Sequence, residues 1–207
     1  MKAYGFIPSL ITSSTPRYNV KSKSLPKKYS YRPFLSPVTN QGADPYCIPH
    51  SIACWLNWRE NLKKGTKNDY HIKYADIYRA KKTVTIGEGM TYLDAFDYLK
   101  RKGVKTDKGI MRISEVGFIP SEQFLKPAII ANGPCFGALP VYNSESDEFW
   151  KKNGGKIEGW HAIAIVGWNE QGYIIRNSWG VGFADRGYVT LPYSDFYNFR
   201  EVWTILG

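Results

Sequence analysis

Three residues whose side chains together support thiol chemistry are spread along the sequence: Cys47, His161 and Asn177. Cys47 lies in the stretch NQGADPYCIPHSIACWLNW, residues 40–58, at the start of a segment with helical spacing. The unpaired N–H groups and the dipole at the start of a helix favour a thiolate, so they lower the pKa of a cysteine placed there. Nucleophilic catalysis needs such a thiolate, a base beside it and donors for an oxyanion.

His161 and Asn177 lie sixteen residues apart in two β-rich runs, GWHAIAIVGW and IIRNSWG. Two adjacent strands joined by a turn would set them side by side, so that Asn177 fixes the imidazole of His161. Taken singly, each residue has a simpler interpretation. A cysteine before a helix is more often a packing residue, a lone histidine is usually structural, and an Asn before Ser-Trp-Gly is a turn residue. The conjunction of the three favours a Cys-His-Asn site.

The elements that must position these residues are mainly helices up to residue 133 and short strands after it. Helical spacing and stop signals predict helices over about 49–62, 70–83, 91–103 and 121–133. β-rich runs cut by Gly, Pro and Asn follow at 134–142, 161–169, 172–180, 187–193 and 200–207. This order predicts an α+β fold in which a helical lobe lies beside an antiparallel, barrel-like sheet, with a cleft between the two lobes.

A chain of 207 residues suits one domain, or two small lobes around one cleft. Residues 1–24 are rich in Ser, Thr, Pro and Lys and read as an N-terminal arm. The arm has one apolar patch, through which it is expected to dock on the body; the patch comprises Tyr4, Phe6, Ile7, Leu10 and Ile11. Residues 25–207 form the predicted body, with a helical lobe at about 40–130 and a β lobe at about 131–207.

The charge is strongly positive, with 28 Lys and Arg against 18 Asp and Glu, a net charge of +10. No contiguous run of five or six basic residues and no zinc-finger, helix-turn-helix or RNA-recognition signature accompanies it. These features argue against a nucleic-acid partner. They leave open a solvated basic surface, a preference for acidic partners, or attachment to a larger assembly.

Three cysteines without CxxC spacing favour neither a disulfide framework nor a zinc site, and no metal or organic cofactor is expected. The N-terminal stretch lacks the apolar core of a signal peptide, and no run of 18 apolar residues indicates a membrane span. The sequence therefore predicts a cytoplasmic protein, expected as a monomer.

Three blocks of the sequence resemble the signatures of papain-like cysteine peptidases: PVTNQG followed by Cys47, HAIAIVGW, and RNSWGVGFADRGYVTLPY. The resemblance spans roughly residues 25–193, and the last block is its most specific part. The segments YGFIPSL, GEGMTYLDAFDYLKRKGV and LPYSDF look more like the compact bacterial and phage-type branch than the plant or lysosomal enzymes. The resemblance implies that residues 25–207 form a papain-like peptidase domain, which would act on a peptide or protein substrate.

The resemblance also implies a role for each matching residue. Cys47 would be the nucleophile, His161 the general acid and base, and Asn177 the orienting residue. The side-chain amide of Gln41 would donate to the oxyanion together with the backbone N–H of Cys47, and Trp179 would shield the His161–Asn177 hydrogen bond from water. Acylation of the thiol by the peptide carbonyl, followed by hydrolysis, would complete the reaction.

A substrate pocket is implied in the same way. Gly87, Gly89 and Met90 match the wall along which an extended substrate backbone would pair. Ala138 and Ala162 would form the floor under the side chain two residues before the cut, which favours an apolar or aromatic side chain there. The alternative interpretation is that these are turn glycines and core alanines.

The turn before the nucleophile departs from the family pattern, because Asp44-Pro45-Tyr46 stands where Cys-Gly-Ser is usual. A carboxylate at Asp44 would raise the pKa of the thiol and weaken it as a nucleophile. His50 is also atypical. One interpretation is a second proton acceptor, but its place on the first helical turn favours an exposed or capping histidine. The long prosegment of lysosomal relatives is not expected; the arm around residues 4–11 is instead predicted to pack near the cleft and to be partly autoinhibitory.

Three functions remain open on these residues. The first is a thiol endopeptidase or a related amide hydrolase, which the presence of Cys47, His161, Asn177 and Gln41 favours. The second is a catalytically disarmed papain-like protein that binds a peptide or partner, which the altered turn would support. The third is a transamidase or peptide ligase that uses the same thiol and passes the acyl group to an amine.

Overall fold

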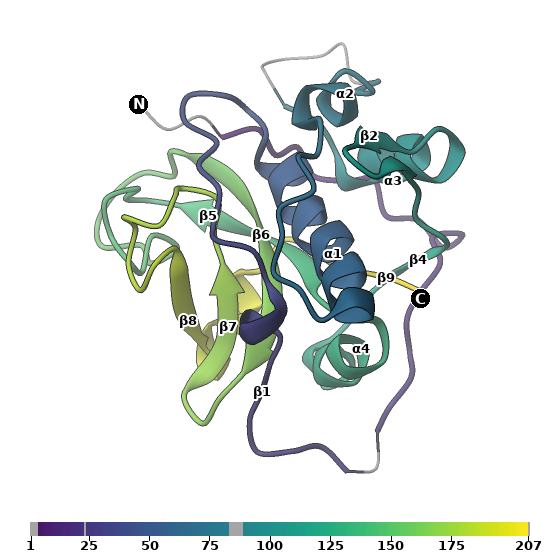
Figure 1. Ribbon diagram of the computed structural model, residues 1–207. Coiled ribbons are helices and arrows are strands. Elements are labelled where there is room, and N and C mark those ends of the chain that lie inside the picture. Colours follow the sequence, from purple (N-terminus) through teal and green to yellow (C-terminus); the bar gives the residue numbers. More distant parts are fainter. Residues whose placement is uncertain (1–3, 23, 83–88, 207) are drawn as a thin grey trace.

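A long central helix organises the structure, which is a computed structural model that describes residues 4–22, 24–82 and 89–206. This helix, α1, covers Cys47–Lys64 and ends at Gly65, whose left-handed φ of 63° suits a residue without a side chain. It is buried on nearly every side over its first three turns, because the sheet covers one side and the other helices cover another (Figure 1).

The remaining helices are shorter: α2 (Tyr74–Tyr78), α3 (Tyr92–Arg101) and α4 (Leu125–Asn132), with 3₁₀ turns η1 (Arg32–Phe34), η2 (Glu122–Phe124) and η3 (Tyr193–Asn198). The hydroxyl of Thr91 accepts from the N–H of Asp94 at 3.0 Å and so caps the start of α3. The helix predicted over 70–83 is helical only at 74–78 among its described residues. His71 breaks it with φ 48°, and the Asp69 side chain accepts from the His71 N–H in a local turn.

The five predicted β-rich runs all contain strands: β5 (Cys135–Val141), β6 (Gly159–Trp168), β7 (Gly172–Arg176), β8 (Tyr188–Pro192) and β9 (Val202–Ile205). Together with β4 (Val116–Phe118) they form an antiparallel sheet in the order β4-β9-β5-β6-β7-β8, and β1 (Tyr29–Ser30) adds to β6. β2 (Val104–Thr106) and β3 (Gly109–Met111) form a separate hairpin. The fold is α+β, as predicted, but the sheet does not close into a barrel within the described residues.

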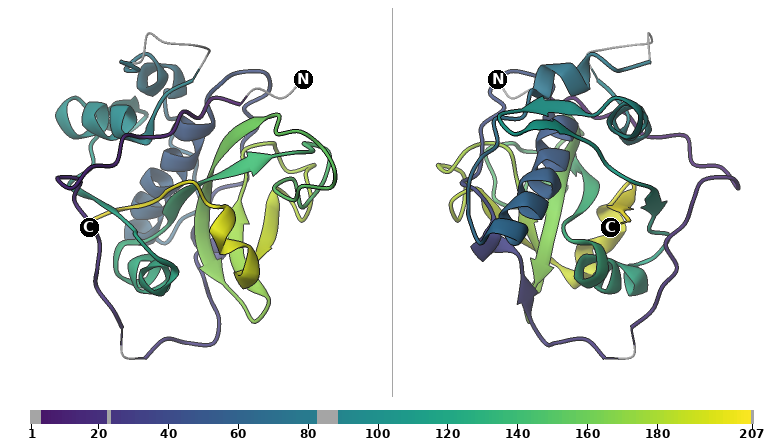
Figure 2. Two further views of the ribbon diagram at one scale, coloured as in Figure 1. Left: turned by 180° about the vertical axis from the view of Figure 1, so that it is seen from behind. Right: turned by 45° about the vertical axis from the view of Figure 1, so that its right-hand side comes forward.

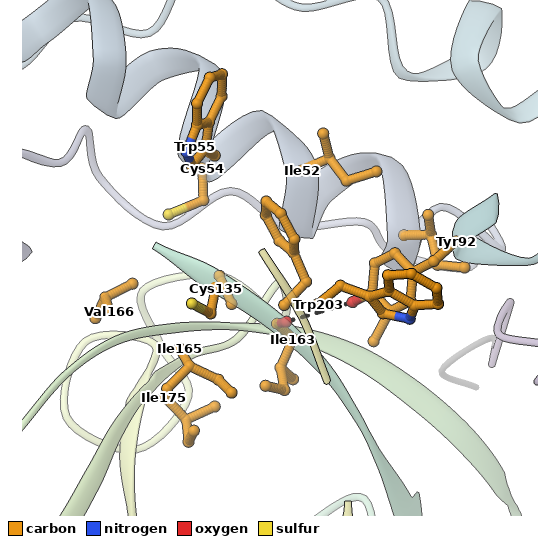
Figure 3. Close-up of a cluster of buried hydrophobic side chains, with 14 of the residues drawn as sticks. Ile52, Cys54, Trp55, Tyr92, Cys135, Ile163, Ile165, Val166, Ile175 and Trp203 are labelled. Atoms are coloured by element: carbon orange, nitrogen blue, oxygen red, sulfur yellow. Dashed lines mark hydrogen bonds between the residues drawn. The ribbon is translucent and has the colours of Figure 1, made fainter. Parts of the chain in front are cut away.

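The core lies between α1 and the sheet (Figure 3). Cys54 of α1 and Cys135 of β5 both belong to this cluster. Both thiols are free and buried. The hydroxyl of Tyr92 donates to the carbonyl of Gly137 at 3.1 Å, which ties the start of α3 to β5. The core therefore fixes α1, which begins at Cys47, against the sheet.

The N-terminal arm lies against the body at two places and crosses in front of the start of α1 (Figure 2, left). Near the cleft, Phe6 forms a parallel bridge with Met90. Further along, Arg17 forms a parallel bridge with Phe118 of β4, and Tyr18 is buried. Between the two contacts Leu10 is 79% exposed. The arm is thus held at two points, and the segment between them is exposed.

Candidate active site

Cys47 is the first residue of α1 and is fully buried. Burial raises the pKa of its thiol to about 11, although the backbone N–H groups of Ala162, Gly5 and Ile48 act in the opposite direction. Ala162 directly follows His161 on β6, so the sulfur lies against the strand that carries the imidazole. The expected depression of the thiol pKa is therefore outweighed by burial in this arrangement, and one of the N–H groups at the sulfur, that of Gly5, belongs to the arm.

His161 and Asn177 meet at the sheet, where β6 and β7 run antiparallel. The Nε2 of His161 donates to the Oδ1 of Asn177 at 2.7 Å, and the N–H of Ser178 donates to the same oxygen at 2.7 Å. The two donors fix which way the amide of Asn177 faces. The juxtaposition predicted from two strands and a turn is thus present, with the imidazole in the tautomer or charge state that carries a proton on Nε2.

Trp179 covers this pair. Its indole stacks on the imidazole of His161 with ring centroids 4.6 Å apart and planes inclined by 25°. Phe149 and Phe183 pack edge-on against the indole at 5.0 Å and 4.9 Å. The aromatic cover keeps the His161–Asn177 hydrogen bond buried, where it is stronger than it would be in water.

Gln41 is buried in the loop that leads to α1 and is tied to the segment after β7. Its backbone N–H donates to the carbonyl of Ser178 at 2.8 Å, and the hydroxyl of Ser178 donates to its Oε1 at 2.6 Å. Its Nε2 donates to the carbonyl of Asp44 at 2.9 Å. Gly42, with φ 61°, allows the tight turn that follows. The amide is therefore held with its NH₂ group toward the turn that precedes Cys47.

The arm occupies the wall at which a substrate backbone was expected. The N–H of Met90 donates to the carbonyl of Gly5 at 3.0 Å, and the N–H of Ile7 donates to the carbonyl of Met90 at 2.9 Å. Phe6 packs edge-on against Tyr92 at 5.8 Å. The backbone N–H of Gly5 is one of the donors that lower the pKa of the Cys47 thiol, so the arm presents a donor to the sulfur.

Two carboxylates hold the arm on either side of Gly5. The N–H and the hydroxyl of Ser9 both donate to buried Glu201, at 2.9 Å and 2.8 Å. The hydroxyl of Tyr4 donates to Glu158 at 2.5 Å. Beyond Tyr4 a cavity of about 850 Å³ remains open beside Trp179.

Gly5 fits only because it has no side chain. A Cβ placed there would lie inside the van der Waals radius of the Pro45 carbonyl oxygen, in the turn before the nucleophile. A larger residue at this position would separate the arm from the turn.

The other predicted substrate residues fall as follows. Gly89 faces the side chain of Ile7, and Met90 is buried under the arm. Ala138 and Ala162 are buried opposite each other on β5 and β6. Gly87 lies outside the described residues. The roles of these residues in substrate binding stay predictions.

The unusual turn before Cys47 does not act on the thiol in the way the sequence suggested. Asp44 is exposed, and it is its backbone carbonyl that engages Gln41. The first cause of the raised pKa of Cys47 is burial. Tyr46 packs against Tyr78 of α2 with ring centroids 5.1 Å apart, which anchors the turn to the helical side.

His50 was predicted to be exposed or to cap the helix, and this was wrong. It is 7% exposed, its ring stacks on Tyr74 at 3.9 Å, and its Nδ1 is 2.7 Å from the hydroxyl of Thr39. Burial, with help from Arg176 and His161, lowers its pKa to about 3. A local pattern cannot show this burial, because the ring that covers His50 belongs to Tyr74 of α2, a later segment of the chain.

The neutral His50 makes stability depend on pH. Its pKa is about 3 in the fold and about 6.5 in an unfolded chain, so the unfolded state binds the proton more readily. Stability should therefore fall as pH drops below 6.5, by on the order of 3 kcal/mol between pH 7 and pH 4. Urea unfolding of His50→Phe should show a much weaker loss over this range.

Exposed His71 provides the control for that experiment. Its pKa is raised by Asp107, so its contribution has the opposite sign and is lost as pH rises. His71→Phe should leave the acid loss intact. Equal acid sensitivity in His50→Phe and the parent chain would show that His50 is not its source.

Within the described residues, no group of three His, Cys, Asp or Glu side chains is arranged to hold a metal ion. The described helices also include none with the length and apolar character needed to cross a bilayer.

The fold and this site define a thiol peptidase class, and comparison with known proteins identifies the family. The sequence profile of the papain family cysteine proteases matches residues 50–198, which include His161 and Asn177 and begin three residues after Cys47. The chain belongs to this family.

Individual relatives agree with that assignment. A gut-specific cysteine proteinase of Caenorhabditis elegans is 32% identical over 78 residues, a match that covers 34% of this chain and 24% of the relative. Among solved structures, xylellain, a cysteine protease from Xylella fastidiosa, superposes with a TM-score of 0.82 at 20% identity, over 99% of this chain and 96% of its own. Procathepsin B S9 from Trypanosoma congolense gives 0.78 at 16% identity, over 99% and 86%. These structures share the fold.

Proposed function

We propose that this chain is a thiol endopeptidase that cleaves peptide bonds through an acyl-enzyme. The observation that carries the proposal is the buried hydrogen bond between His161 and Asn177, on the strand that also contacts the sulfur of Cys47. The three residue types are those that a thiol nucleophile, its acid–base partner and its orienting group require.

Cys47 attacks the peptide carbonyl as a thiolate while His161, held by Asn177, protonates the leaving amine. The negative oxygen that forms is stabilised by the backbone N–H of Cys47 and by the amide of Gln41, which Ser178 holds in place. Water, activated by His161, then hydrolyses the thioester and releases the second product.

The arm determines when this chemistry is available. With residues 5–7 paired along Met90, the substrate wall is filled and the thiol is buried and protonated. Displacement of the arm exposes the sulfur, which removes the main cause of its raised pKa. We infer that the arm-covered chain is the resting form of the enzyme.

Alkylation of the thiols tests the proposal. In a Gly5→Val chain, iodoacetamide should label Cys47 at pH 6 about tenfold faster than it labels Cys54 or Cys135, because a thiolate–imidazolium pair persists at that pH. Peptide mass spectrometry across pH 4–9 locates the label, and His161→Ala should remove the advantage. Labelling of Cys47 only above pH 8, no faster than at the two core cysteines, would contradict the proposal.

A further inference from the structure

A small polar cavity lies directly behind the His161–Asn177 pair. Its volume is about 10 Å³, and its polar lining consists of Thr39, His50, Ser51, Arg176, Asn177 and Ser178. A space of this size accommodates the centre of one water molecule, provided that the walls offer hydrogen-bond partners.

Asn177 supplies a donor that needs such a partner. Its Oδ1 already accepts from His161 and Ser178, so the amide cannot turn over to exchange its ends. The side chain is 4% exposed, and among the described residues no acceptor reaches its Nδ2. A buried NH₂ group without an acceptor is costly, and native structures usually satisfy it with protein or with ordered water.

His50 lies at the same cavity and offers an acceptor. A neutral imidazole carries one donor and one acceptor nitrogen. When Nδ1 donates to the hydroxyl of Thr39, at 2.7 Å, Nε2 is the acceptor. The low pKa of His50 keeps the ring in this neutral form at neutral pH.

The other groups around the cavity are already engaged. The guanidinium of Arg176 donates to the carbonyls of Ser36 and Pro37 at 2.7 Å and 2.8 Å. The hydroxyl of Ser51 donates to the carbonyl of Ile48 at 2.8 Å. The hydroxyl oxygens of Thr39, Ser51 and Ser178 can still accept a hydrogen bond, and His50 adds a ring nitrogen that can link a water molecule to Asn177.

We propose that the cavity binds one water molecule, which accepts a hydrogen bond from Asn177 Nδ2 and donates one to His50. His50 is then a positioning residue: through the water it holds Asn177, and through Asn177 it holds the imidazole of His161. The kinetic consequence rests on the proposed function, whereas the water site itself does not.

The charges that face His50 fit this arrangement. Arg176 and His161 both disfavour a second positive charge, and Tyr74 lies flat against the ring. The burial that raises the pKa of Tyr74 and of Cys54 keeps both groups neutral. No carboxylate is among the causes that shift the pKa of His50, so the imidazole stays an acceptor while His161 changes its charge during the reaction.

A high-resolution crystal structure of the full chain tests the water site without any assay. We expect density for one water molecule within about 3.2 Å of both Asn177 Nδ2 and His50. A dry cavity, or a water molecule that touches neither group, would overturn the proposal. This result stands even if the chain hydrolyses no peptide, so it is separable from a failure of the proposed function.

Variants of His50 test the positioning role in a Gly5→Val chain. His50→Phe keeps a ring on Tyr74 but has no acceptor, so kcat should fall about tenfold while KM changes less than about twofold. The basic limb of the kcat/KM profile should move to lower pH, because a loosely held Asn177 stabilises the imidazolium of His161 less. His50→Gln retains a polar side chain and should recover most of the activity.

Two further results test the positioning role of His50. His71→Phe, which removes an exposed histidine, should leave kcat and the pH profile unchanged. A folded His50→Phe chain with the kinetics and pH profile of its parent would overturn the positioning role. If His50→Phe fails to fold, the comparison of His50→Gln with its parent and the density in the cavity decide the question.

Discussion

Replacing Gly5 by valine is expected to raise kcat/KM for peptide hydrolysis about 100-fold, through a shift of the population toward the open cleft. The valine side chain has no room beside the carbonyl of Pro45, so the arm must leave the turn before the nucleophile. Its pairing with Met90 and its cover over Cys47 are lost together. The pKa of the thiol should fall from about 11 because burial is the first cause of its rise.

Hydrolysis of a fluorogenic peptide library, together with alkylation rates at pH 7, measures this effect. Gly155→Val is the matched control, since a Cβ there would meet only ordinary contacts, and it should behave like the parent chain. Ser9→Ala should give a smaller rise, because it removes one of the two hydrogen bonds to Glu201. Equal activity of the Gly5→Val chain and its parent would show that the arm does not limit access to the cleft.

Replacing Cys47 by alanine in the Gly5→Val chain should lower kcat by at least about 10⁴-fold, since no other group can form the acyl-enzyme. Asn177→Ala should cost less, about 100-fold, because His161 remains but loses the acceptor that orients it. In both variants KM should change little, because neither side chain is expected to bind the substrate in its ground state.

Steady-state kinetics on the best peptide of the library check this prediction. Cys135→Ala serves as the control: its thiol lies in the core, so its loss should lower stability and leave kcat near that of the parent. Residual hydrolysis by the Cys47→Ala chain above about 1% would point to another nucleophile and would remove the thiol mechanism.

Local patterns were enough to identify much of this protein. The five β-rich runs each contain a strand, because alternating and continuous apolar residues between Gly, Pro and Asn have few other stable arrangements. The helix predicted over about 49–62 is α1, although it begins earlier, at Cys47, and runs on to Lys64. The antiparallel meeting of His161 and Asn177 followed from two strands and a short connection. Each of these features depends on residues that are close together in the sequence.

Contacts between distant segments were decided by the tertiary structure alone. The parallel pairing of Phe6 with Met90, the hydroxyl of Ser178 on Gln41 and the burial of His50 against Tyr74 each join parts of the chain far apart in sequence. Short strands such as β4 form only because β9 supplies their hydrogen bonds. A pattern in one segment carries no information about which other segment will cover it. The sequence by itself determined the reacting groups and predicted that the arm packs near the cleft, whereas the fold determined that the arm pairs with Met90 and that a buried histidine lies close to the asparagine.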